Sequence, residues 1–301
     1  MTGSLRALFA VDGSECSTAM MRCWSAWRGA SGDALKALLL TAVPPPLHVW
    51  PTAGFDPGLI EEALRSIGRE RLAGAERWMQ EGRVPWESVV RIGAPAQTIV
   101  AEAQRERAGL IVMGTRGLSA LRGLLVGSMA LRVVQSSAIP VWLMPPHARC
   151  PVELGRRLNL LVAVDGSDAA NQAAVWAART APSFGECTIE LMSVRPELAP
   201  IGAALRVPGE AIRNWCEELG SAAIDVARAA MGVAGSRATA RIGDGPVVEE
   251  LCRTAAQTRA DAIVVGSRRL GALGKAALGS VSSALLQTST CSVVVVREAV
   301  E

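Results

Sequence analysis

The stretch "LRALFAVDGSE", residues 5–15, returns as "LNLLVAVDGSD" at residues 158–168, and this repetition decides the fold. Two more segments recur in the same order. "GLIVMGTRG" (109–117) returns as "DAIVVGSRR" (261–269), and "LLVGSMALRVVQSSAIPVWLM" as "AALGSVSSALLQTSTCSVVVV". Self-similarity of this kind indicates repeated structural units. We predict two tandem domains joined by a segment rich in Pro and Arg, with limits at residues 1–147 and 156–301.

Within each repeat, short apolar runs alternate with longer segments of helical period, which is typical of a parallel sheet covered by helices. We therefore expect an α/β fold with two open five-stranded parallel sheets and helices on both faces of each. The first repeat predicts strands at 5–12, 35–43, 87–92, 109–114 and 139–144, and helices at 16–29, 58–81, 95–107 and 128–137. The second predicts strands near 158–165, 187–194, 237–242, 261–266 and 291–297.

Composition narrows the class of protein. The 301 residues are 50% hydrophobic, and 31 basic against 28 acidic residues leave a net charge of only +3. These charges are mixed along the chain and Tyr is absent, which argues against a nucleic-acid partner. No apolar run approaches the roughly 18–20 residues that span a bilayer, and the first residues lack a signal-peptide pattern. We expect a cytoplasmic protein with no membrane partner.

Cysteines and histidines offer no catalytic or metal constellation. The seven cysteines show no CxxC spacing, and Cys16 and Cys23, seven positions apart on one helix face, are predicted to be small buried hydrophobes. The two histidines, His48 and His147, fall near prolines in connecting segments. We therefore predict neither a Ser-His-Asp triad nor a metal site.

A glycine-rich loop follows the fourth strand of the first repeat. Ligands of doubly wound sheets bind beyond the carboxyl ends of strands, where strand order reverses. Gly114 closes that strand, and Gly117 and Gly127 are expected to provide a positive φ or a close backbone approach. Ser128 is expected at the N-cap of the next helix, whose free N–H groups favour a phosphate. Ordinary helix capping is the alternative reading.

Charged residues accompany this loop. Arg116 and Arg122 add positive charge, and Asp12 follows the first strand where its carboxylate can accept hydrogen bonds from a ribose or a base. Asp165 repeats it in the second half. The alternative role of Asp12 is to cap the first helix.

These residues resemble the universal stress protein family. Its nucleotide motif, G-x2-G-x9-G-[ST], is matched by Gly114, Gly117, Gly127 and Ser128, and its opening "AVDGS" occurs at 10–14 and 163–167. The "DGSxxS" run ends at Ser17, and "IVMGTRG" supplies the family's strand and turn. The resemblance covers nearly the whole chain. It implies an adenine nucleotide alpha hydrolase-like fold that binds ATP in some members and not in others.

Carried over residue by residue, the resemblance implies a set of ligand contacts. Base and ribose contacts fall at Val11, Asp12, Val43 and Met113, and phosphate contacts at Gly114, Gly117, Gly127, Ser128 and Met129, with Arg116 nearby. The counterparts in the second repeat are Asp165, Val194, Val265, Gly266, Gly279 and Ser280. Arg269 stands where the second glycine is expected, so the first half is predicted to be the stronger site.

Three functions compete at this stage. The first is an ATP-binding module of the stress response that takes up Mg²⁺ with the nucleotide and is not an enzyme. The second is a slow ATPase or an adenylyl-handling enzyme, which fold alone does not exclude. The third is a scaffold with both sites silent. "GALGKAA" (271–277) lacks the Walker A spacing. We also expect the apolar fifth strands, 139–144 and 291–297, to pair as an internal pseudo-dimer, with a homodimer as a further possibility.

Overall fold

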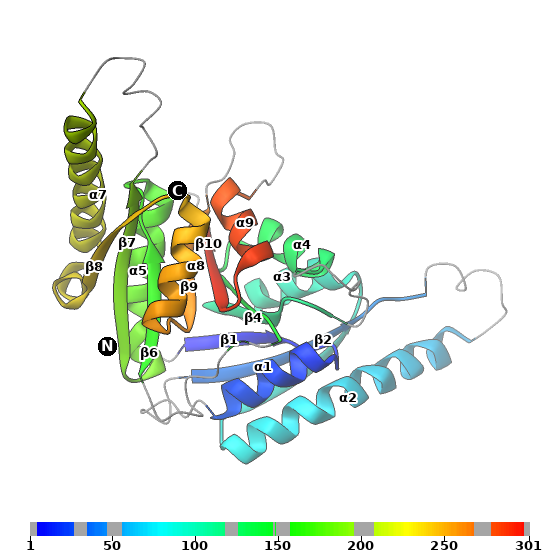
Figure 1. Ribbon diagram of the computed structural model, residues 1–301. Helices are drawn as coiled ribbons and strands as arrows, with labels where there is room; N and C mark the ends of the chain where they lie inside the picture. The colour runs from blue at the N-terminus through cyan, green and yellow to red at the C-terminus, as the bar shows by residue number, and fades with distance from the viewer. Residues whose placement is uncertain are drawn as a thin grey trace. The chain divides into compact units, whose positions relative to one another are not determined.

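The computed structural model describes residues 5–26, 35–46, 56–117, 126–146, 148, 157–195, 208–267 and 278–297. The chain divides into two compact units, Met1–Arg156 and Arg157–Glu301. Figure 1 shows the helices and strands of each unit.

The first unit is a parallel sheet with helices on both faces. Its strands are β1 (Leu5–Ala10), β2 (Leu35–Val43), β3 (Trp86–Ile92), β4 (Leu110–Gly114) and β5 (Val141–Met144), in the order β3-β2-β1-β4-β5. Its helices are α1 (Glu15–Ala26), α2 (Pro57–Gly82), α3 (Pro95–Arg105) and α4 (Ser128–Ser136). Helices α1 and α2 pack together on one face, and α3 packs with α4 on the other (Figure 1).

The second unit repeats this arrangement. Its sheet has the order β10-β9-β6-β7-β8, again with parallel pairs. The strands are β6 (Leu158–Ala163), β7 (Cys187–Arg195), β8 (Thr239–Asp244), β9 (Ala262–Ser267) and β10 (Ser292–Arg297). The helices are α5 (Asp168–Thr180), α7 (Gly209–Met231), α8 (Val247–Thr258) and α9 (Ser280–Thr288), with short 3-10 turns at Ala181–Phe184 and Gly232–Arg237. The predicted fold class is confirmed.

Strand β1 lies in the centre of the sheet, which explains why its sequence is an almost unbroken apolar run. Ala7, Leu8 and Phe9 are fully buried because helices cover both faces of the sheet. Trp24 of α1 packs edge-on against Phe9, with ring centroids 5.2 Å apart. The same helix buries Cys16, as predicted, and burial raises the pKa of its thiol.

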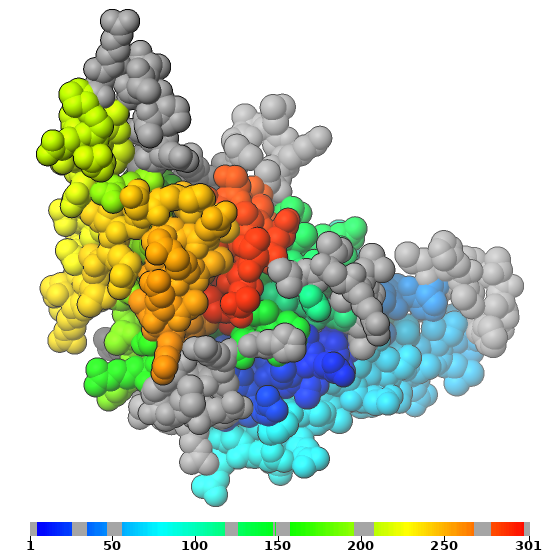
Figure 2. Space-filling view, in the orientation of Figure 1, coloured from blue at the N-terminus to red at the C-terminus, as the bar shows by residue number. Residues whose placement is uncertain are grey.

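Helix α2 is defined at both ends and fixed to the sheet by a glycine. Asp56 caps its N-terminus by accepting a hydrogen bond from the Gly58 N–H at 2.8 Å, and Arg83 ends it in the left-handed conformation. A Cβ on Gly68 would lie only 2.3 Å from Val90 Cγ1, so a glycine is what allows the helix to approach β3. Leu59 on α2 is exposed, and Figure 2 shows atoms of this helix at the surface of the first unit.

Within the described ranges, no helix has both the length and the apolar character required to cross a membrane.

A buried carboxylate ties α3 to β3. Glu102 is 5% exposed and accepts two hydrogen bonds from Arg91, each of 3.0 Å, and a further one from Arg105. Burial alone would raise the pKa of Glu102, but these two guanidinium groups outweigh it and hold that pKa below its usual value.

We expect Glu102→Gln to lower the free energy of unfolding at pH 7 by about 1.5 kcal/mol, because charge-assisted hydrogen bonds become neutral ones. The pKa of Glu102 is lower in the folded than in the unfolded state, so its contribution is complete above the unfolded-state pKa and is lost as pH falls through the folded-state value. Urea unfolding should therefore show wild type and variant converging towards pH 3. The exposed Glu62 supplies the control, Glu62→Gln, which should match wild type at both pH values.

Candidate functional site

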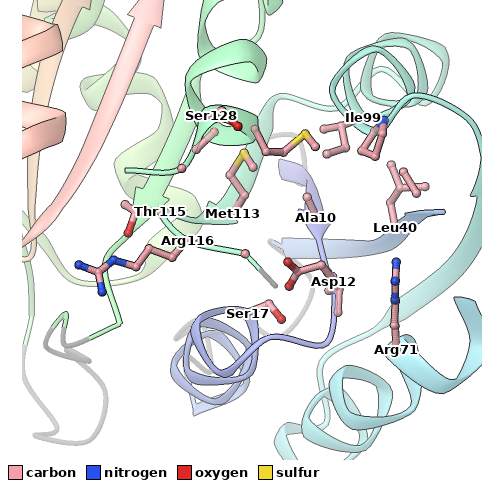
Figure 3. Close-up of a pocket in the computed structure, with 18 of the residues that line it drawn as sticks. Ala10, Asp12, Ser17, Leu40, Arg71, Ile99, Met113, Thr115, Arg116 and Ser128 are labelled. Carbon is pink, nitrogen blue, oxygen red and sulfur yellow. The ribbon is translucent and has the colours of Figure 1, made fainter. Parts of the chain in front are cut away.

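The strand order of the first unit creates a place for a ligand. From β1 the chain moves outward to β2 and β3, then returns to form β4 on the other side of β1. The loops after β1 and β4 therefore part, as expected at a topological switch point. A cavity of about 320 Å³ lies at these carboxyl ends. Its base is formed by Ala10, Leu40 and Met113, which are neighbours across three strands (Figure 3).

Nine of the ten residues predicted for the first half line this cavity: Val11, Asp12, Met113, Gly114, Arg116, Gly117, Gly127, Ser128 and Met129. Val43 is not among the lining residues. Side chains alternate between the faces of a strand, so Leu40 and Ala42 face the cavity and Val43 points the other way. The Val43 carbonyl accepts a hydrogen bond from the Gly93 N–H. The contacts of all these residues with a ligand stay predictions.

The three motif glycines differ in what surrounds them. A Cβ on Gly114 would lie 2.7 Å from Cys16 Sγ, and one on Gly117 would lie 2.6 Å from Asp12 Oδ2. At Gly127 the nearest atom would be the Thr115 carbonyl oxygen at 3.4 Å, an ordinary contact. The contact with Cys16 thus explains why residue 114 is a glycine. Among the described residues, no comparable contact explains why residue 127 is one.

Of the two expected reasons for these glycines, a positive φ or a close approach, the structure does not show the positive φ. Gly127 has a φ of −76°, and Gly117 is not among the described glycines with positive φ. The close approach, and not the backbone conformation, is what a side chain at position 117 would disturb. Arg269, the counterpart of Gly117, lies outside the described residues.

Helix α4 points its N-terminus into the cavity. Its N-cap is Gly127 and Ser128 is the first helical residue, so the expectation of Ser128 at the N-cap is corrected by one position. A glycine has no side chain to accept the hydrogen bonds of the first turn, and no side-chain cap is present. The first N–H groups of α4 are therefore not capped by a side chain and are positioned to receive an anion.

Asp12 holds the turn that leads into α1, while its expected contact with a ribose or base stays a prediction. Its Oδ1 accepts a hydrogen bond from the Ser14 N–H at 3.0 Å, and Ser14 Oγ in turn accepts one from the Ser17 N–H in the first turn of α1. Its Oδ2 faces the position of Gly117 on the far side of the opening. Oδ1 thus stabilises the turn after β1, while Oδ2 points across the cavity.

Arg116 is only partly in the expected place. It follows β4 at the rim of the cavity, but Figure 3 shows its side chain running away from Asp12. The other predicted cation of this loop, Arg122, lies outside the described residues.

Further lining residues escaped the sequence analysis. Pro95 and Ile99 of α3 form one wall, and Arg71 of α2 rises from the opposite side (Figure 3). Strand alternation could have pointed to Ala42 in place of Val43. No local sequence pattern distinguishes Arg71 as a lining residue, because the sequence around it is that of a surface helix with several polar residues.

The second unit has a cavity of about 470 Å³ at the corresponding strand ends. All six residues predicted for this half line it: Asp165, Val194, Val265, Gly266, Gly279 and Ser280. Asp165 is more exposed than Asp12 and receives hydrogen bonds from both the N–H and the hydroxyl of Ser167. The counterpart of Arg71 is Ala223. Gly13 and Gly166 share a φ of +80°, and a Cβ on the first would meet Arg71 while one on the second would meet Ala223.

The described ionisable groups around the first cavity are Asp12, Arg71 and Arg116. Arginine remains protonated at neutral pH and does not serve as a general base. No group of three or more His, Cys, Asp or Glu side chains suited to a metal ion occurs in the part of the chain that the structure describes.

The sequence matches the universal stress protein family over residues 4–145 and again over 157–297. A universal stress protein of Mycolicibacterium smegmatis is 26% identical over 310 residues, which cover 96% of each chain. Universal stress protein MJ0531 of Methanocaldococcus jannaschii is 39% identical over 83 residues, covering 28% of this chain and 49% of that protein. The matched segments likewise span only 61% of a universal stress protein from Thermus aquaticus.

The fold also matches solved structures. The crystal structure of a universal stress protein from Archaeoglobus fulgidus aligns with a TM-score of 0.66 at 21% identity, covering 97% of this chain and 98% of that one.

Substitution by alanine should change the stability of the second unit at one glycine of its cavity and not at another. A Cβ on Gly266 would lie 2.2 Å from the Ala169 carbonyl oxygen, whereas for one on Gly279 the nearest atom of the described residues is Ser282 Oγ at 3.9 Å. We expect Gly266→Ala to lower the free energy of unfolding of this unit by about 2–3 kcal/mol through overpacking. Urea unfolding should show Gly279→Ala within about 0.5 kcal/mol of wild type. Equal effects of the two substitutions would contradict this division of roles.

Proposed function

Because this chain belongs to the universal stress protein family, we propose that its first unit binds ATP with Mg²⁺ and acts as a cytoplasmic nucleotide-dependent module of the stress response. Nucleotide occupancy would change the conformation or the protein contacts of the chain. One observation carries the proposal: the N-terminus of α4, without a side-chain cap, opens into a cavity where, among the described residues, a Cβ on Gly127 would meet no atom closer than the Thr115 carbonyl oxygen at 3.4 Å.

The α4 side of the cavity suits the phosphates. Backbone N–H groups at a helix N-terminus favour anions through their hydrogen bonds and the helix dipole. Gly117, Gly127 and Ser128 would hold the phosphates by backbone and hydroxyl groups. Mg²⁺ would arrive with the phosphates, and no side chain of this chain is assigned to it.

The opposite side suits a nucleoside. Leu40, Ala42 and Ile99 offer an apolar lining for a flat base, while Asp12 can accept hydrogen bonds from ribose hydroxyls. A volume of about 320 Å³ falls within the range typical of small-molecule sites.

A binding role is supported over catalysis by the groups around the cavity. Asp12 is the one carboxylate among the described lining residues, and its Oδ1 is engaged by the Ser14 N–H. Turnover needs a group that can take a proton from the attacking water, close to the γ-phosphate. Asp12, assigned here to the nucleoside end, is poorly situated for that task, so we propose that any hydrolysis is slow.

The second cavity is proposed to be the weaker site. The difference does not rest on backbone conformation, because Gly117 has no positive φ. The reasons that remain are the side chain of Arg269 itself and the replacement of Arg71 by Ala223.

We further propose that the apolar strands β5 and β10 pair with each other, since unpaired strand edges of this kind favour association. We expect cysteines introduced along these two strands to form disulfides within one chain under mild oxidation, detected by mass spectrometry of non-reduced peptides. Cross-links found solely between chains would instead indicate a homodimer through the same edges.

Asp12→Ala should weaken ATP binding by about 1–3 kcal/mol, because a partly buried hydrogen-bond acceptor is lost. Isothermal titration calorimetry in the presence of Mg²⁺ measures this directly. Asp165→Ala is the matched control and should leave the stronger binding event unchanged. Wild-type affinity in a folded Asp12→Ala variant would assign Asp12 to the turn after β1 alone.

A further inference from the structure

Arg71 is positioned unlike the other arginines of α2. It lies on the cavity side of the helix, half-buried, and the first part of its side chain crosses Gly13, where a Cβ would meet Arg71 Cγ at 3.3 Å. Gly13 has a φ of +80°, so a glycine is required there for the backbone and also clears the path of the arginine. The turn after β1 thus directs Arg71 into the opening.

The guanidinium of Arg71 is available to a ligand. By contrast, Arg65 and Arg77 on the same helix each pair with a glutamate one turn away. Among the described residues, no hydrogen bond or ion pair engages Arg71, although it lines the same cavity as the Asp12 carboxylate. A guanidinium that lines the cavity without a partner among the described residues keeps its hydrogen-bond donors for a ligand.

The location of Arg71 identifies which part of a ligand it would meet. Figure 3 shows Arg71 below Leu40 and across the opening from Ile99, whereas Ser128 at the start of α4 lies on the opposite side of the cavity. Phosphates at α4 would therefore leave the base at the Arg71 end. A planar guanidinium suits that end, since it stacks on aromatic faces and donates hydrogen bonds to ring nitrogen or carbonyl acceptors.

We propose that Arg71 recognises the nucleobase end of the ligand in the first cavity, as a stacking and hydrogen-bonding residue that the second cavity lacks. The inference rests on the proposed nucleotide function. Its substitution by alanine is compatible with the fold, because Ala223 occupies the same place beside Gly166 in the second unit.

The test is a displacement titration of the full chain with ATP and with adenosine. A Gly279→Trp background is designed to block the second cavity: Gly279 lines it, and among the described residues a Cβ there would meet only Ser282 Oγ, at 3.9 Å. Arg71→Ala should weaken both ligands by about ten-fold, the size of a desolvated cation–π contact plus a hydrogen bond. Arg71→Lys should not restore either, because an ammonium lacks the planar stacking surface. Arg69→Ala, at an exposed position two residues earlier, should bind both ligands like the parent.

The outcomes separate this inference from the proposal on which it rests. A parent chain that binds neither ATP nor adenosine would overturn the proposed function and this inference together. Parent-like binding by Arg71→Ala, with its unfolding curve unchanged, would overturn the inference alone. A loss confined to ATP and restored by Arg71→Lys would make Arg71 a phosphate contact and overturn its assignment to the base.

Discussion

Parallel pairing of β1 with β4, which sets Ala10 opposite Met113, is the constraint on which the site depends. These strands are far apart in the sequence, and the chain reaches β4 only after building β2 and β3 on the other side of β1. The loop carrying Asp12 and the loop carrying Gly117 thereby face each other across one opening. Because helices cover both faces of the sheet, its carboxyl edge is where polar backbone groups of adjacent loops can converge without being paired in the ladder.

The glycines around the strand ends have two different roles, close packing within the protein and space for a ligand, and a sequence motif does not distinguish these roles. Gly114 and Gly266 admit the helix that follows the first strand of each unit, since a methyl group would collide with Cys16 in one and with the Ala169 backbone in the other. Among the described residues, Gly127 and Gly279 meet no such obstacle, which agrees with the proposal that a ligand occupies the space beside them. A match to all motif positions therefore combines information about packing with information about binding. Only the latter bears on function.

Sequence reasoning succeeded where a pattern is local or repeated. Alternating strands and helices, the tandem repeat and the convergence of Asp12 with the glycine loop all follow from hydrophobic periodicity and from the rule for doubly wound sheets. It failed where a single residue depends on register or on distant packing. Family resemblance does not fix which face of β2 is turned to the cavity, so the predicted set contains Val43 and not Ala42, which lines the cavity; a ligand contact of Val43 stays a prediction. For Gly117 the sequence left a positive φ and a close approach open, and the packing against Asp12 decides for the close approach.

Arg71 escaped for a related reason. A helix on the surface carries many polar residues, and which of them turns inward is decided by the depth at which the helix sits. Gly68 and Gly220 occupy corresponding places in α2 and α7: a Cβ would collide with Val90 at 2.3 Å in the first unit but make an ordinary contact with Ile242 at 3.4 Å in the second. Gly13 and Gly166 share the same left-handed turn beneath those helices. The two units thus have glycines at the same places in this helix and this turn. They differ in the side chain that the helix directs towards the cavity, which is an arginine in the first unit and an alanine in the second. Substitution at such a position can change what a repeat binds without disturbing its fold. The reason is that the backbone of the helix sets the position of the side chain, and no described core residue depends on contacts with it.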